Sequence, residues 1–342
     1  MKKIFFLLSL FLFSCESDVE YTLGNRDNFQ TIKEHPVIEI KLEGKASQRD
    51  AELSGLTWYK DKLILLPQFP YLFGDGISGA IFYIHKEKIK QYLQTKNHAP
   101  IKPEKLKFNA DGFERFNHDG SGYEAIAFSG DTVFVSIESY AGEMKGYTAL
   151  GKINFDKHEI RLYKNSLTEN DYTNRLPNHT EETITLFKDR LISIHESNGA
   201  NVFPDSYAIS YSLNLDEYSK LDFPNIEYRI TDATEISSDS TFWAINYLWP
   251  GDIKLLNPAN DGLFEKFGIG KSHKDNSGVE RLIQMKLNPN SISVTETPPI
   301  YLELSPNVKS RNWEGIAVLD DLGFIIASDK HPRTILAFVP SN

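Results

Sequence analysis

Polar residues suited to acid–base or metal chemistry recur in register in five similar segments of this chain. One opens each segment and another follows fourteen positions later, as from residue 54 to residue 68. The first set is Ser54, Glu124, Glu182, Asp232 and Glu314. The second set is Gln68, Glu138, Glu196, Asn246 and either Ser328 or, with a one-residue bulge, Asp329. Carboxylates gathered in one place must be separated by water, take up protons or share a cation.

Each segment has the pattern of a β-hairpin. Bulky apolar residues occupy alternate positions after the first polar residue, which indicates a strand. Turn-forming residues surround a shared aspartate, and a second β-rich run follows it. These aspartates are Asp61, Asp131, Asp189, Asp239 and Asp321. The start of the first strand of an antiparallel hairpin lies beside the end of the second, so both polar sets should project at one edge.

Five hairpins spread along 342 residues predict an all-β protein, a β-propeller of five four-stranded blades. The gaps between hairpins leave room for two outer strands per blade. The gap between residues 232 and 314 is long, so it either hides a degenerate sixth hairpin or holds a loop over residues 247–277. Residues 36–42 are β-like and should pair with residues 334–339, closing the ring. We expect a single propeller domain over residues 36–342.

The polar edge of the hairpins predicts a binding site at one mouth of the central tunnel. Four carboxylates of the first set could hold a hard cation through oxygen atoms, and a wide, ligand-rich site favours Ca²⁺. These predicted metal ligands are Glu124, Glu182, Asp232 and Glu314. The alternative is that the side chains only cap strand ends and line a wet tunnel. The second set then supplies Glu138 and Glu196 as catalytic groups, and Gln68, Asn246 and Asp329 as ligand-binding groups.

Two further residues near the last hairpin could take part in chemistry. His331 follows Asp329 in a loop, where an imidazole could serve as an acid or base. Arg311 precedes Glu314 and could hold a phosphate or carboxylate of a ligand, or pair with a neighbouring glutamate. His195, by contrast, should point to the opposite face of its strand from Glu196 and is expected to be a packed residue.

The first residues have the pattern of an export signal. Lys2 and Lys3 precede an apolar run over residues 4–13 that is too short to span a bilayer. The run ends in Leu12-Phe13-Ser14-Cys15, which resembles the lipobox of bacterial lipoproteins. This resemblance implies a signal peptide over residues 1–14, an acylated Cys15, and a polar tether over residues 15–35. An ordinary signal with an incidental cysteine is the alternative. The expected location is the cell envelope at the outer membrane, with the side of the membrane left open.

Composition excludes some partners. The net charge of −10 gives no electrostatic reason to bind nucleic acid or anionic lipid headgroups. Cys15 is the only cysteine, so the exported part has no disulfide. We expect a monomer that contacts the bilayer through its acylated cysteine.

Residues 312–317 and 326–329 (Asn-Trp-Glu-Gly-Ile-Ala and Ile-Ala-Ser-Asp) resemble the signature of the esterase-like phytase propellers. The segments that begin at Glu124 and Glu182 are weaker copies, and the resemblance extends over about residues 36–340. It implies hydrolysis of a phosphomonoester or ester. Related propellers of the gluconolactonase and paraoxonase kind hold Ca²⁺ in the tunnel and hydrolyse lactones or esters. Ser54 departs from the pattern because it lacks a carboxylate.

A fold shared by many functions leaves a second reading open. The chain could instead be a non-catalytic propeller that binds a glycan, a small metabolite or a protein partner. Tyr247, Trp249 and Pro250 are the candidates for an exposed binding face.

The lipobox resemblance predicts that Cys15→Ala releases the protein from membranes, because the variant has no residue to acylate. Fractionation after a high-salt wash measures this. A Cys15→Ala product that stays with the membrane fraction would rule out anchoring through this residue.

Overall fold

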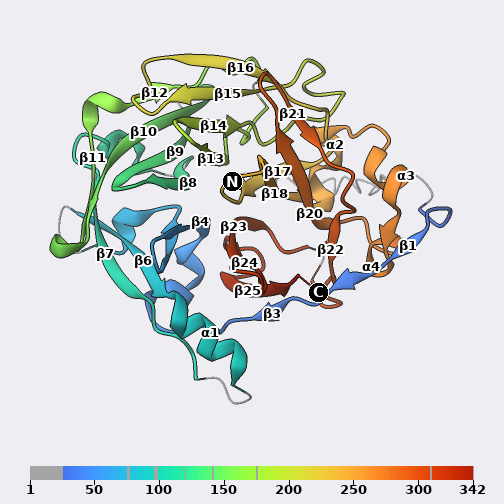
Figure 1. The fold of residues 1–342 in the computed structure, drawn as a ribbon, viewed down its shortest axis with the longest axis horizontal. Helices are drawn as coiled ribbons and strands as arrows, with labels where there is room; N and C mark the ends of the chain where they lie inside the picture. Colours follow the sequence, from blue (N-terminus) through green and yellow to red (C-terminus); the bar gives the residue numbers. More distant parts are fainter. Residues whose placement is uncertain are drawn as a thin grey trace, which may run out of the picture.

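The chain folds as an all-β propeller, and the computed structural model describes residues 26–74, 78–95, 99–118, 120–140, 142–174, 176–308 and 310–341 (Figure 1). The predicted signal peptide and Cys15 lie outside these residues. Five antiparallel hairpins are present where the repeats predict them. They are β4 (Leu53–Tyr59) with β5 (Lys62–Pro67), β8 (Ser121–Ser129) with β9 (Thr132–Tyr140), β13 (Thr183–Phe187) with β14 (Arg190–Ile194), β17 (Arg229–Ala233) with β18 (Thr241–Leu248), and β23 (Trp313–Leu319) with β24 (Gly323–Ser328).

The shared aspartates all lie in the turns of these hairpins, as predicted. In four turns the residue just before the aspartate has positive φ, the left-handed conformation that a tight turn requires. These residues are Lys60 (57°), Gly130 (58°), Lys188 (55°) and Asp320 (49°). The repeated aspartate therefore marks a repeated turn geometry.

Outer strands extend each hairpin into a larger sheet. They are β6 (Gly79–His85) and β7 (Glu104–Asn109); β10 (Met144–Asn154), β11 (Glu159–Leu162) and β12 (Thr168–Glu169); β15 (Tyr207–Ser212) and β16 (Tyr218–Asp222); β20 (Val279–Leu287), β21 (Ile292–Val294) and β22 (Ile300–Leu302); and β25 (Ile335–Pro340) with β3 (Ile38–Glu39). Parallel pairing of β7 with β11 joins the first two units into one nine-stranded sheet. The pairing of β3 with β25 confirms the predicted closure by residues 36–42.

The first strands of the five hairpins form a closed ring. β4 contacts β8, β8 contacts β13, β13 contacts β17, β17 contacts β23, and β23 contacts β4 again. Figure 1 shows these strands around the centre of the molecule, with the later strands of each unit farther out.

Small residues allow the ring strands to approach closely. A Cβ added to Gly55 would lie 3.2 Å from the Cα of Ala125 on β8, and one added to Gly315 would lie 2.7 Å from Cγ of Leu56 on β4. Threonine hydroxyls then link neighbouring ring strands. Thr185 Oγ1 donates to the carbonyl of Thr234 at 2.9 Å, and Thr231 Oγ1 to that of Trp313 at 2.5 Å.

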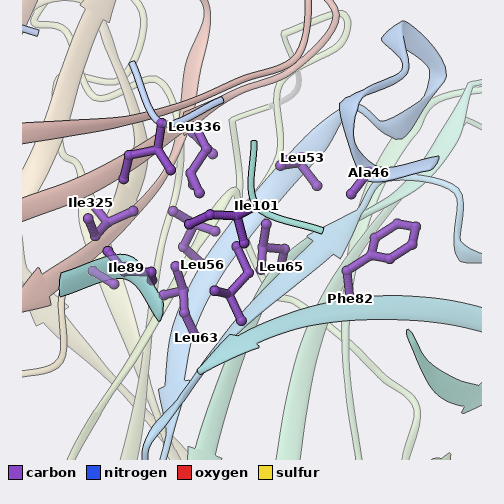
Figure 2. Close-up of a cluster of buried hydrophobic side chains, with 14 of the residues drawn as sticks. Ala46, Leu53, Leu56, Leu63, Leu65, Phe82, Ile89, Ile101, Ile325 and Leu336 are labelled. Atoms are coloured by element: carbon purple, nitrogen blue, oxygen red, sulfur yellow. The ribbon is translucent and has the colours of Figure 1, made fainter. Parts of the chain in front are cut away.

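Apolar side chains fill the space between neighbouring units. Figure 2 shows one such cluster, in which side chains from the first and last units meet. Leu53, Leu63 and Leu65 come from the first hairpin, and Ile325 and Leu336 from the last unit. Helix α1 (Lys86–Gln94) adds Ile89 to this core. The cluster therefore seals the junction between the two ends of the chain.

The structure corrects the expectation for the long gap and for the tether. The gap holds α2 (Ile253–Leu256), α3 (Gly262–Phe267), β19 (Ile269–Gly270) and α4 (Lys271–Lys274) in place of a hairpin or a plain loop.

Residues 26–35 are not a tether: β1 (Thr31–Ile32) pairs with β19, and β2 (Glu34–His35) with β22. Arg26 is only 6% exposed, and its guanidinium donates to the carbonyl of His273 at 2.8 Å. The polar composition of this segment suggested a tether. The segment is instead docked on the propeller by strands and carbonyls that lie more than 200 residues away in the sequence.

No helix within the described residues is long and apolar enough to cross a membrane.

The ring predicts that Gly315→Ala lowers the free energy of unfolding by about 1–3 kcal/mol, because its new methyl group overpacks Leu56. The matched control is Gly262→Ala at the start of α3, where an added Cβ meets nothing within 4 Å. We expect this control to be neutral or stabilising because alanine favours a helix over glycine. Urea unfolding measures both, and equal midpoints for Gly315→Ala and wild type would contradict close packing of the ring.

Candidate functional site

β-Bulges at the starts of the ring strands set the direction of the side chains in the first polar set. In β4, β8 and β23 the strand register shifts across one residue, which is Ser54, Glu124 or Glu314. In β17 the shift spans two residues, one of which is Asp232. A bulged residue has no partner in the ladder, and the local bend redirects its side chain. The repeats therefore predict the positions of these side chains, and the bulges set their direction.

Six buried carboxyl groups interact at this edge of the ring, and we call them the acidic cluster: Glu124, Glu138, Glu182, Glu196, Glu314 and Asp329. Gln68 Nε2 donates to Glu124 Oε1 at 3.1 Å, and Thr180 Oγ1 donates to Glu138 Oε2 at 3.2 Å. The site residues predicted from both polar sets are thus largely brought together. Glycine makes room for them, since a Cβ on Gly122 would lie 2.5 Å from Glu124 Oε1.

Burial and mutual repulsion raise the pKa of these carboxyl groups. Burial, followed by repulsion from Glu182 as the next largest cause, raises the pKa of Glu124 to about 8. The same two causes raise the pKa values of Glu138, Glu182 and Glu314 well above the usual range. Several members of the cluster therefore hold protons near neutral pH, or need a positive partner to ionise.

One buried cation is present within the cluster. Arg229 Nε lies 2.5 Å from Glu196 Oε1 and 3.6 Å from Asp252 Oδ2. Burial still raises the pKa of Glu196 to about 8, although Arg229 opposes that rise. Glu182 is buried, and its carboxyl has another carboxyl, that of Glu196, as a hydrogen-bond partner. One arginine therefore leaves most of the carboxyl groups uncompensated.

Sequence reasoning missed Arg229 and His179. His179 is buried, with Nε2 at 4.0 Å from Glu196 Oε2, and burial lowers the pKa of its imidazole to about 3. Both residues stand three positions before an acidic start of a repeat, as Arg311 does before Glu314. Comparison of this position across the repeats would have found them.

Other predicted residues are held by the protein itself. Arg311 Nε donates to Glu280 Oε2 at 2.9 Å. Of the two roles predicted for Arg311, its guanidinium therefore has the second, which is to pair with a neighbouring glutamate. Asn246 accepts from Arg281 Nε at 2.8 Å and donates to backbone carbonyls. Asp232 Oδ2 accepts from the backbone N–H of Ile316 on the neighbouring ring strand, β23, at 2.8 Å.

The two histidines considered in the sequence analysis differ in exposure. His331 is exposed, and its backbone N–H donates to Asp329 Oδ1 at 2.6 Å. It therefore lies at the rim beside the acidic cluster. His195 is buried against Tyr172 and Phe203, which confirms that it is a packed residue.

The donor chemistry of the acidic cluster fits a hard cation, because its candidate ligands are carboxylate oxygens and the buried Glu182 carboxyl has another carboxyl, that of Glu196, as a hydrogen-bond partner. The geometry is not preassembled: within the described ranges, no three histidine, cysteine, aspartate or glutamate side chains are placed to hold a metal ion. Loading a cation would therefore require these carboxyl groups to turn toward one another.

No protein-family model and no curated protein matches this chain. Among solved structures, a glucose dehydrogenase is 10% identical with a TM-score of 0.47, covering 90% of this chain and 99% of that chain. The soluble aldose sugar dehydrogenase of Escherichia coli is 11% identical with a TM-score of 0.45 and the same coverages. A mutant α-L-arabinanase of Cellvibrio cellulosa is 9% identical with a TM-score of 0.44, covering 86% and 91%. Likeness at this level concerns the fold alone, and the esterase-like phytase resemblance stays a prediction.

The acidic cluster predicts that stability falls as pH rises from about 5 to about 8. In that range folded Glu124, with a pKa of about 8, keeps a proton that the unfolded chain releases near 4.5. Folding is then favoured by protons, so the free energy of unfolding should drop by on the order of 1 kcal/mol or more. Urea midpoints at pH 5 and pH 8 measure this.

Glu124→Gln should weaken this pH response, since glutamine does not titrate and the other raised carboxyl groups remain. Asp61→Asn is the control, because hydrogen bonding by Lys62 lowers the pKa of Asp61 to about 2, so its effect falls below the tested range. A wild-type midpoint that rises between pH 5 and pH 8 would show that the cluster is already ionised and compensated.

Proposed function

We propose that this protein is an exported, lipid-anchored propeller whose acidic cluster binds Ca²⁺ and supports hydrolysis of a phosphoester or ester. The observation that carries the proposal is the burial of six interacting carboxyl groups around a single arginine. Such an arrangement costs stability unless the groups are protonated or share a cation. Costly polar clusters of this kind are typical of functional sites.

Glu124, Glu182 and Glu314 are the residues that would hold Ca²⁺, with Asp232 as a fourth if it gave up its bond to the Ile316 amide. When bound, Ca²⁺ would polarise a substrate oxygen or lower the pKa of a bound water. Loss of the proton from Glu124 would accompany ion binding, since ligand carboxylates must be ionised.

The second polar set would supply proton transfer and positioning. Glu196 has a pKa near 8, so its carboxyl can exchange a proton near neutral pH, and Glu138 adds a second protonated carboxyl. Gln68 holds Glu124 in place through its amide. His331, exposed at the rim, could exchange a proton with bulk water. Asp329 restrains the loop of His331 through the amide of that residue.

A non-catalytic binding propeller is the second candidate, favoured by two observations. Arg311 is held by Glu280, and no metal-holding triad is formed in the described part of the chain. The ligand would be a glycan, a metabolite or a protein. Among the residues proposed for its binding face, Trp249 is 49% exposed. Tyr247 is buried, so it does not belong to that face. In either case Cys15 would attach the protein to the outer membrane.

Ca²⁺ should raise the free energy of unfolding, by about 2.7 kcal/mol at a hundredfold excess over Kd, because it binds only the folded state. Melting in millimolar Ca²⁺ and in EDTA measures this. Hydrolysis of phosphoester, carboxylester and lactone panels should then depend on Ca²⁺. Glu124→Gln and Glu314→Gln should lose both responses, and Asp189→Asn, an exposed turn variant, should keep them.

The outcomes separate the candidates. Ca²⁺-dependent turnover supports the hydrolase, and Ca²⁺ stabilisation without turnover of any panel supports the binding propeller. Identical melting with Ca²⁺ and EDTA would show that the acidic cluster is a structural feature.

A further inference from the structure

A cavity lies along the same ring of strands, away from the acidic cluster. Its volume is about 280 Å³, and all five ring segments line it. The lining residues follow the first polar positions by about one to five places, as Ile126 follows Glu124 and Ile316 follows Glu314. Each residue advances a strand by roughly 3.3 Å, so the cavity is displaced along the ring axis toward the hairpin turns.

The walls of this cavity are mostly apolar. Its inner part is formed by buried aliphatic side chains, namely Leu56, Ile126, Ile184 and Ile316. Trp58 and the partly exposed Val318 also line it, and the Trp58 indole donates to the Val318 carbonyl at 2.6 Å. This bond fixes the indole across the junction of β4 and β23. The cavity is therefore an apolar cup with a fixed aromatic side chain.

Glu235 is the only ionisable side chain among the residues that line the cup. It is reachable by solvent, and its carboxylate forms no hydrogen bond or ion pair within the described residues. The neighbouring cation Lys86 lies over the Trp58 ring and is held by Asp320 at 2.8 Å. Partial burial of Glu235 raises the pKa of its carboxyl. The cup thus presents one uncompensated anion beside apolar walls.

We propose that this cavity is a second binding site, which takes a small organic ammonium ion through the Glu235 carboxylate and the apolar walls. Alkyl groups of such an ion bury apolar surface against the aliphatic side chains. The ammonium charge is stabilised by the Glu235 carboxylate, because Lys86, which lies over the Trp58 ring, is paired with Asp320. The site is independent of the acidic cluster and of the hydrolase proposal.

Choline and its neutral isostere 3,3-dimethyl-1-butanol test the proposal on the purified full-length protein. They have the same shape, so a difference in affinity reports the charge. Calorimetry should show choline binding at least about tenfold more tightly than the alcohol, and Trp58 fluorescence should change on binding. Equal affinities, or no choline binding, would overturn the proposal.

Substitutions of residues that line the cup test whether choline binds there. Glu235→Gln should remove the preference for choline, Glu235→Asp should keep much of it, and Asp189→Asn should leave it unchanged. Trp58→Phe should remove the fluorescence change. Choline lodged in the acidic cluster would instead keep both its affinity in Glu235→Gln and its fluorescence change in Trp58→Phe, and the proposal would then be wrong.

Discussion

The close approach of the five ring strands is the constraint on which the rest of the structure depends. Gly55 and Gly315 let backbone and side chains of the next strand come within the space that a methyl group would occupy. Threonine hydroxyls then bond across the junctions. A wider ring would place the strand starts apart, in water. The narrow ring buries them, so the same packing that closes the propeller also creates the unfavourable electrostatics of the acidic cluster.

That burial explains why the acidic cluster and the apolar cup differ chemically although the same ring strands build both. At the bulged strand starts, Glu124 and Glu314 have no partner in the ladder, and their carboxyl groups are buried close enough to raise one another's pKa. A few residues later the regular ladder resumes, and aliphatic side chains line the wall. Polar and apolar binding chemistry are thus separated by strand register. Hence the two sites can be altered by different substitutions.

Much of this arrangement could be predicted from residue spacing. The aspartate turns, the hairpins, the closing strand and the gathering of carboxyl groups all follow from local periodicity that recurs along the chain. The docking of residues 26–35 could not, because Arg26 bonds to carbonyls near residue 273 and no local pattern specifies them. The bulges were also missed: the one allowed for at Asp329 lies instead at Glu314, in the partner strand of the same hairpin. A single extra residue is indistinguishable in sequence from a register shift.

The basic residues three positions before Glu182, Asp232 and Glu314 show where repetition stops being informative. They occupy one repeat position, yet His179 is kept neutral by burial, Arg229 contacts Glu196, and Arg311 is bound by Glu280. Glu280 comes from β20, after the irregular insertion of the fourth unit, so the partner of Arg311 has no counterpart in the other repeats. Of three possible cations, only Arg229 therefore serves the acidic cluster. This local loss of symmetry, more than the number of carboxyl groups, is why Arg229 is the one buried cation that pairs with the acidic cluster among the residues that the structure describes.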